Sequence, residues 1–159
     1  MAFSEYFTQS EFLATQSKYD NTPRPEHVAN LERLAALLDR LRGHVGRPIR
    51  INSGFRSHDV NREAGGSATS QHLQGEACDF VIPGAGARLG PLFYDLIRGN
   101  VAQGAGRPIQ WGQLILYIDS ASSHPRFVHI SLPTKKFRNE VYVTVYGTKH
   151  YARLDCAEV

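Results

Sequence analysis

The segment Ser70-Gln71-His72-Leu73-Gln74-Gly75-Glu76-Ala77-Cys78-Asp79 places an imidazole and a carboxylate seven residues apart, joined by a bend that contains glycine. The apolar residues over 77–82 predict a β-strand after this bend. Side chains alternate across a strand, so Asp79 lies on the face opposite Cys78 and Phe80. We expect the more apolar row to pack on the core, which leaves Asp79 on the other side of the strand.

A second segment, Phe127-Val128-His129-Ile130-Ser131, also predicts a strand, with His129 opposite its apolar row. If the two strands are neighbours, Asp79 and His129 converge on one point, and the glycine bend lets His72 reach it. A single histidine or aspartate in such a place is usually a structural residue, so the prediction depends on the combination. Two imidazoles and a carboxylate can hold zinc and leave a position open for water, which permits hydrolytic chemistry. Zinc is favoured over magnesium or calcium because imidazole suits a borderline metal.

The rest of the sequence predicts helices followed by a sheet. Apolar residues recur at three- and four-residue spacing from Pro25 to Arg42, which is typical of an amphipathic helix. Other predicted elements are a short helix after Thr8, a helical turn at 59–64, a helix over 91–103, and strands near 48–52, 77–82, 109–118, 127–132 and 141–146. Helices first, then a mostly antiparallel sheet with one inserted helix, indicate an α+β fold. We find no internal repeat and no long linker, so residues 1–159 are expected to form one domain.

Composition narrows the classes of function. The chain is 42% hydrophobic, which is ordinary for a globular protein. No apolar run reaches the roughly 18 residues that a membrane span needs. The N-terminal residues have neither a basic nor a continuous apolar segment, so no secretory signal is expected. A net charge of +3 without charge blocks or interleaved aromatic and basic residues argues against nucleic-acid binding. The cysteines, Cys78 and Cys156, are too few for a disulfide framework, and Cys78 is expected to be a buried apolar residue.

These motifs together resemble the zinc D-Ala-D-Ala carboxypeptidase-like peptidases of family M15, especially their small branch common in bacteriophages and bacteria. The likeness is carried by Asp20-Asn21-Thr22-Pro23, the segment from Pro48 to Ser57, Asn61, Gly65-Gly66-Ser67, Ser70 to Asp79, Trp111 to Ile115, and Phe127 to Ser131. It implies the α+β fold of the Hedgehog and D-Ala-D-Ala peptidases, with N-terminal helices packed on the sheet. It also implies His72, Asp79 and His129 as Zn2+ ligands. Arg56 is implied as the group that steadies a substrate oxygen, and its alternative is a surface salt bridge.

The resemblance further implies hydrolysis of peptide bonds in bacterial peptidoglycan, by a carboxypeptidase or by an endopeptidase of cross-links or stem peptides. The expected setting is phage-type lysis or cell-wall entry, by a protein made in the cytoplasm that acts at the wall after release or from a virion. The alternative is a catalytically impaired module that binds cell wall or forms part of a virion. It arises because many relatives carry an acidic residue three positions before the last histidine, and others a histidine two positions before it, although the small phage-like branch often lacks both. This chain has Arg126 and Phe127 there.

Further candidate residues surround the predicted zinc ligands. His124 is the nearest titratable group before the last strand, and we predict it as a proton shuttle ahead of Asp119 and Glu76. Ser70 is expected to orient the bend or to contact substrate, and no base can be paired with it to make a nucleophile. Gln113 either presents its amide to the cleft or has a structural role.

Overall fold

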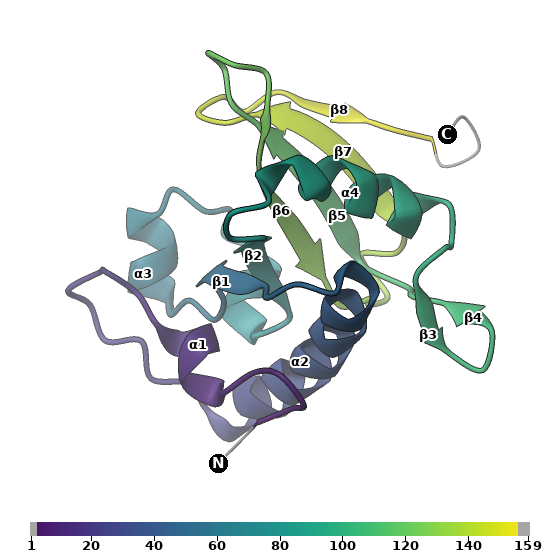
Figure 1. Cartoon of the computed structure of the whole chain (residues 1–159). Helices are drawn as coiled ribbons and strands as arrows, with labels where there is room; N and C mark the ends of the chain where they lie inside the picture. The colour runs from purple at the N-terminus through teal and green to yellow at the C-terminus, as the bar shows by residue number, and fades with distance from the viewer. Residues whose placement is uncertain (1–2, 156–159) are drawn as a thin grey trace.

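The predicted α+β arrangement is confirmed by the computed structural model, which describes residues 3–155 (Figure 1). The helices are α1 (Gln9–Leu13), α2 (Pro25–Val45), α3 (His58–Glu63) and α4 (Leu89–Ile97), with short 3-10 turns η1 (Gln71–Gln74) and η2 (Gly86–Arg88). The strands are β1 (Arg50–Ser53), β2 (Ala77–Val81), β3 (Ala102–Gly104), β4 (Arg107–Pro108), β5 (Gln113–Ile118), β6 (Pro125–Ser131), β7 (Glu140–Val145) and β8 (Tyr151–Arg153).

One sheet organises the molecule, with the strand order β1-β2-β6-β5-β7-β8. Neighbouring strands are antiparallel, except that β5 and β7 are parallel. After β6 the chain crosses the end of β5, and β7 then runs along the edge of β5 that is opposite β6. The sheet is therefore mostly antiparallel, as predicted. Strands β3 and β4 form a separate small ribbon.

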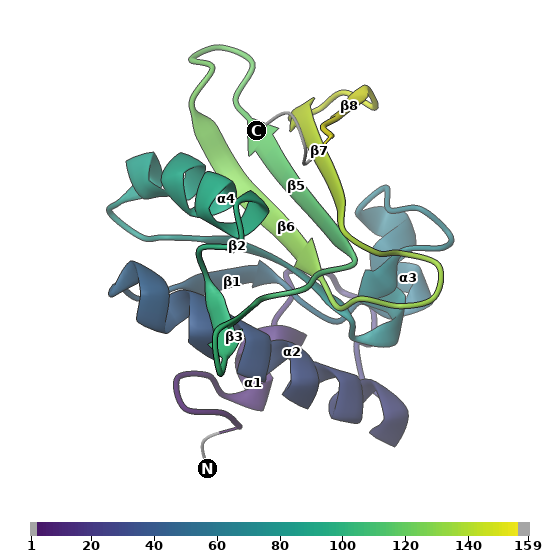
Figure 2. The same cartoon turned by 90° about the vertical axis from the view of Figure 1, so that its right-hand side faces the viewer.

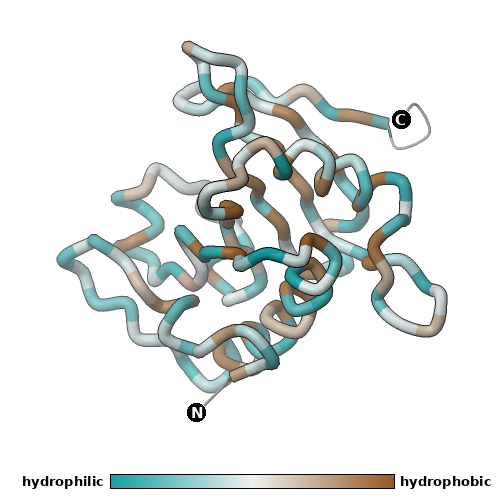
Figure 3. The backbone as a smooth tube through the Cα atoms, viewed as in Figure 1, coloured by the Kyte–Doolittle hydropathy of each residue, from teal (hydrophilic) through white to brown (hydrophobic). Residues whose placement is uncertain are grey.

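The two faces of the sheet have different neighbours. The longer helices α2 and α4 place their buried leucines in one hydrophobic core with the even-numbered residues of β2, β5 and β6, among them Phe80, Leu114 and Val128. Helix α3 lies on the opposite side of the sheet from α4 (Figures 1 and 2). Apolar residues concentrate in the strands and the longer helices, while the connecting loops are more hydrophilic (Figure 3). The odd-numbered face of β2 and β6 is thus available for polar side chains.

Helix α2 begins at a proline and ends at a glycine, as the sequence predicts. Pro25 occupies its first turn, where a missing N–H costs nothing, and Gly46 ends it in the left-handed conformation with φ of 70°. The predicted end at Arg42 is therefore three residues early. In the described part of the chain, no helix is both long enough and apolar enough to cross a membrane.

Several predicted boundaries were wrong. The helix expected over 91–103 ends at Ile97, because Gly99 turns the chain with φ of 72° into the β3–β4 ribbon, which the sequence did not indicate. The strand expected over 109–118 begins only at Gln113, and the short strand β8 was missed. Cys78 is buried and free, as predicted, whereas Cys156 lies outside the described residues.

The backbone at Gly54, just after β1, packs closely against the backbone of Phe12 in α1. A Cβ atom there would clash with the carbonyl oxygen of Phe12, which accepts a hydrogen bond from the N–H of Phe55. We expect Gly54→Ala to lower the free energy of unfolding by about 1–3 kcal/mol, because backbone must move to admit the methyl group. Gly43→Ala is the matched control: its Cβ meets no atom within 4 Å in α2, so it should stabilise by about 0.5–1 kcal/mol. Chemical denaturation measures both, and equal effects would contradict the steric argument.

Candidate metal centre

Neighbouring strands bring Asp79 and His129 together. Strand β2 pairs with β6 so that Asp79 lies directly opposite His129, and their side chains share one face of the sheet. His72 arrives from η1, which is capped by Ser70 and ends at Gly75 with φ of 72°. One ligand atom from each of His72, Asp79 and His129 lies within 4.8 Å of the others. The predicted convergence is confirmed.

The orientation of the rings directs nitrogen atoms at the Asp79 carboxylate. His129 Nδ1 lies 2.9 Å from Asp79 Oδ1, and His72 Nε2 lies 3.5 Å from the same oxygen. His72 Nδ1 is 2.7 Å from the carbonyl oxygen of Gly54. Because a carbonyl can only accept, Nδ1 of His72 carries the proton and Nε2 keeps its lone pair for a cation.

The second oxygen of Asp79 is bound by Arg56. The guanidinium group places Nη2 at 3.2 Å from Asp79 Oδ2, and its Nε donates to Ser53 Oγ at 2.9 Å. A longer contact of 3.4 Å joins Nη1 to Asn61 Oδ1. The Arg56 side chain is only 15% exposed, so a surface salt bridge does not describe it. Arg56 holds the carboxylate with Oδ1 turned toward the two imidazoles.

Attraction among the groups of this cluster offsets the cost of burying the Asp79 carboxylate. His72, Asp79 and His129 are all buried. Burial lowers the pKa of His72 more than the attraction of Asp79 raises it. Burial also opposes ionisation of Asp79, but attraction to His72 and the hydrogen bond from His129 outweigh it and hold that pKa well below its usual range. His129 Nε2 is buried and has no hydrogen-bond partner in the described part of the chain. A carboxylate that lies between two imidazoles, with one ligand atom from each residue within 4.8 Å of the others, fits a zinc ion.

The other predicted residues lie at different distances from this centre. Ser70 accepts a hydrogen bond from the N–H of His72 at 3.2 Å, so it orients the bend as expected. Gln113 lies on the neighbouring strand β5, two residues before Ile115, which is directly opposite His129. Its side chain therefore shares the face of His129, and the residue is half-buried. His124 is exposed in the loop before β6, and no described hydrogen bond or ion pair joins it to the three ligands. Its role as a proton shuttle stays a prediction.

The two weaker candidates for the base have local partners. Asp119 accepts hydrogen bonds from the backbone of Ser122 and Ala121, which lower its pKa and leave it a poorer base. Partial burial raises the pKa of Glu76, although the charge of Arg33 opposes this shift. Glu76 lines a hollow beside η1 together with residues of the loop after β6.

Sequence reasoning missed several groups at the centre. It did not identify Ser53 and Asn61 as the partners of Arg56, or the Gly54 carbonyl as the partner of His72. It also missed Tyr117 on β5, whose ring stacks on that of Phe127 at 4.3 Å between centroids. The alternation of β5 was the available signal for Tyr117, since odd positions of β5 share the face of His129.

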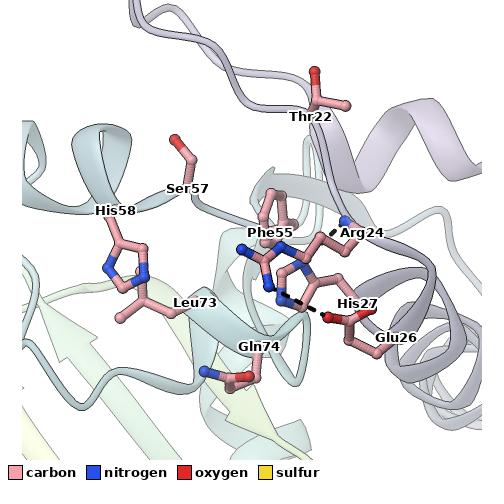
Figure 4. A pocket seen from close by; sticks show the side chains of 9 residues that line it. All are labelled: Thr22, Arg24, Glu26, His27, Phe55, Ser57, His58, Leu73 and Gln74. Atoms are coloured by element: carbon pink, nitrogen blue, oxygen red, sulfur yellow. Dashed lines mark hydrogen bonds and ion pairs between the residues drawn. The ribbon is translucent and has the colours of Figure 1, made fainter.

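A larger hollow of about 340 Å³ lies between the start of α2 and the start of α3, with part of η1 in its lining (Figure 4). Figure 4 shows His58 and Leu73 on one side of it, and Arg24, His27 and Glu26 on the other. Phe55 and Ser57, the sequence neighbours of Arg56, line this hollow, whereas Arg56 and the three predicted ligands do not. The segment 55–57 therefore contributes Phe55 and Ser57 to the hollow and Arg56 to the metal centre.

Comparison with known families adds an independent observation. A family model described as Peptidase M15 matches residues 5–93, which is more than half of the chain. The match contains Arg56, His72 and Asp79 and ends before β5 and β6, so His129 joins the group through the geometry of the sheet. No curated protein matches the chain.

Proposed function

Because the chain belongs to the peptidase M15 family, we propose that it is a zinc-dependent peptidase that hydrolyses peptide bonds in bacterial peptidoglycan. The observation that supports the zinc centre is the convergence of His72, Asp79 and His129, whose ligand atoms lie within 4.8 Å of one another. Peptidoglycan stem peptides are the proposed substrate, and carboxypeptidase and endopeptidase activities both remain within the proposal. The proposed setting is phage-type lysis or cell-wall entry.

The residues at the centre divide the work of hydrolysis. Bound zinc would lower the pKa of a coordinated water to about 7 and polarise a peptide carbonyl. His72 would offer Nε2 to the metal, since its Nδ1 donates to the Gly54 carbonyl and burial lowers its pKa. The guanidinium of Arg56 can stabilise negative charge that develops on a carbonyl oxygen. Its Nη1, with only the long contact to Asn61, is the donor most available to substrate.

Proton transfer needs a group other than the residue at position 126. The Arg126 guanidinium lies 3.9 Å from the centroid of the Tyr146 ring and 3.4 Å from Asp119, and a guanidinium cannot act as a base. His124 remains the proposed shuttle. The presence of Arg126 in place of an acidic residue favours the second candidate function, a module that holds metal and binds cell wall without cutting it.

Digestion of purified peptidoglycan separates these two functions. We expect the zinc-loaded protein to release new amino termini or free D-Ala, detected by mass spectrometry, and we expect a chelator to stop this release and added zinc to restore it. Intact wall in the presence of stoichiometrically bound zinc would support the binding module instead. Release that continues in chelator would contradict a metal-dependent peptidase.

A further inference from the structure

A continuous row of aromatic rings extends from the metal centre across the sheet. We call it the tyrosine face, and its members are Tyr117 on β5, Phe127 on β6, Tyr142 on β7, Tyr146 just after β7 and Tyr151 on β8. Tyr117 stacks on Phe127, with 4.3 Å between centroids and 17° between planes. Edge-to-face contacts continue the row from Phe127 to Tyr146 at 5.9 Å, from Tyr117 to Tyr151 at 6.4 Å, and from Tyr151 to Tyr142 at 6.3 Å.

Strand register places these rings on the side of the sheet that carries the zinc ligands. Phe127 is two residues before His129 on β6, so the two side chains share a face about 7 Å apart. Tyr117 lies directly opposite Phe127, and Ile115 directly opposite His129. Thr144 of β7 pairs with both Tyr117 and Tyr151, which carries the same face on to β8. The tyrosine face is therefore continuous with the metal centre.

The outer rings of the tyrosine face are exposed to solvent. Tyr146 and Tyr151 are each 46% exposed, and exposed aromatic groups gathered in one patch mark a binding surface more often than chance. The Arg126 guanidinium covers the Tyr146 ring at 3.9 Å, and Arg153 lies 5.9 Å from the centroid of Tyr142. The face thus combines ring surfaces, tyrosine hydroxyls and a cation near either end.

We propose that the tyrosine face binds the sugar rings of peptidoglycan while the attached stem peptide lies at the metal centre. This inference rests on the proposed function. A pyranose ring has an apolar surface of C–H groups and a rim of hydroxyls, and tyrosine offers an apolar ring with a hydroxyl at its edge. The carboxylates of the stem peptides complement Arg153, whereas Arg126 is already paired with Asp119 at 3.4 Å. A stem peptide alone, which has no sugar ring, would leave the ring surfaces unused.

The spacing between the face and the centre suits a substrate of this kind. The lactyl group that joins a muramyl sugar to its peptide, plus one amino acid, spans about 7 Å when extended. This is close to the two-residue separation of Phe127 and His129 along β6. A sugar ring on the inner part of the face would therefore leave the first amide bonds of the stem peptide at the metal centre.

The first test compares two substrates: a disaccharide-linked stem peptide and the same peptide without sugar. We expect the wild-type protein to prefer the sugar-linked form, and Tyr151→Ala and Tyr146→Ala each to lower the ratio of the two kcat/KM values about tenfold. The ratio does not depend on the folded fraction of a sample, so a merely structural role would not move it. Tyr94→Ala is the matched control, because Tyr94 is 47% exposed on α4 and should leave the ratio unchanged. An unchanged ratio in both variants would overturn the inference while the proposed function stands.

The second test does not require catalysis. Titration of the full chain with chitotetraose, a chain of N-acetylglucosamine units, should show saturable binding that Tyr151→Leu weakens about tenfold, since leucine keeps apolar volume without a ring surface. Chemical shifts should change on β7 and β8 and not on α4. If the protein cut neither substrate but bound chitotetraose in this way, the proposed function would fail and the sugar site would stand. Absence of saturable binding, or equal binding by the leucine variant, would overturn the sugar site.

Discussion

Replacing His129 with alanine should abolish zinc binding and hydrolysis while most of the fold is retained. His129 contributes one of the three converging ligand atoms, and its Nδ1 lies 2.9 Å from Asp79 Oδ1. Two remaining ligands form a weak site, because catalytic zinc centres are held by three protein ligands. We expect hydrolysis to fall about a thousandfold or more, since a bound metal supplies several kcal/mol of transition-state stabilisation. The fold should survive, because an alanine on β6 leaves the core face of that strand intact.

Metal analysis measures the loss of zinc in this variant, and circular dichroism measures the retention of its fold. The purified variant should contain far less than one zinc per chain and give a wild-type spectrum. His58→Ala is the matched control, because it removes an exposed imidazole from α3 and should retain stoichiometric zinc and full hydrolysis. Stoichiometric zinc in the His129 variant would show that the ligand set is wrongly assigned.

The convergence of His72, Asp79 and His129 could be predicted from the sequence because strand alternation is a local property. The positions of Asp79 and His129 relative to apolar neighbours put each on the face away from the core, and a glycine marked the bend that carries His72. The pairing of the two strands was the remaining condition, and β2 and β6 meet it with Asp79 opposite His129.

The partners of these ligands could not be predicted in the same way. The Gly54 carbonyl binds His72 across 18 positions, and Arg56 reaches Asp79 across 23. Such contacts depend on how a loop packs against the sheet, and loop packing leaves no periodic pattern in the sequence. Strand β8 was missed for a related reason: its three residues are too few to show alternation, and pairing with β7 makes them a strand. One member of the tyrosine face, Tyr151, lies on β8, and its contacts with Tyr117 and Tyr142 depend on that pairing.

Removing the Arg56 side chain tests which of two roles it has. One role is to stabilise charge on a substrate oxygen, and the other is to fix the Asp79 carboxylate so that Oδ1 faces the imidazoles. The 3.2 Å ion pair and the 2.9 Å bond to Ser53 support the second role, and the weakly held Nη1 permits the first. We therefore expect Arg56→Gln to have both effects. Zinc affinity should fall about 10- to 100-fold through loss of carboxylate orientation, and kcat/KM should fall at least about 100-fold.

Arg56→Lys separates the two contributions, because lysine keeps a charge but lacks the planar fork that spans Asp79, Ser53 and Asn61. We expect this variant to recover part of kcat/KM and little of the zinc affinity. Zinc titration by calorimetry and steady-state kinetics give the two readouts, with Arg62→Gln as control, since Arg62 is 77% exposed and pairs only with Asp59 among the described ion pairs. Wild-type zinc affinity in Arg56→Gln would remove the positioning role. If kcat/KM were also unchanged, Arg56 would have no part in the site, and the ion pair with Asp79 would only stabilise the fold.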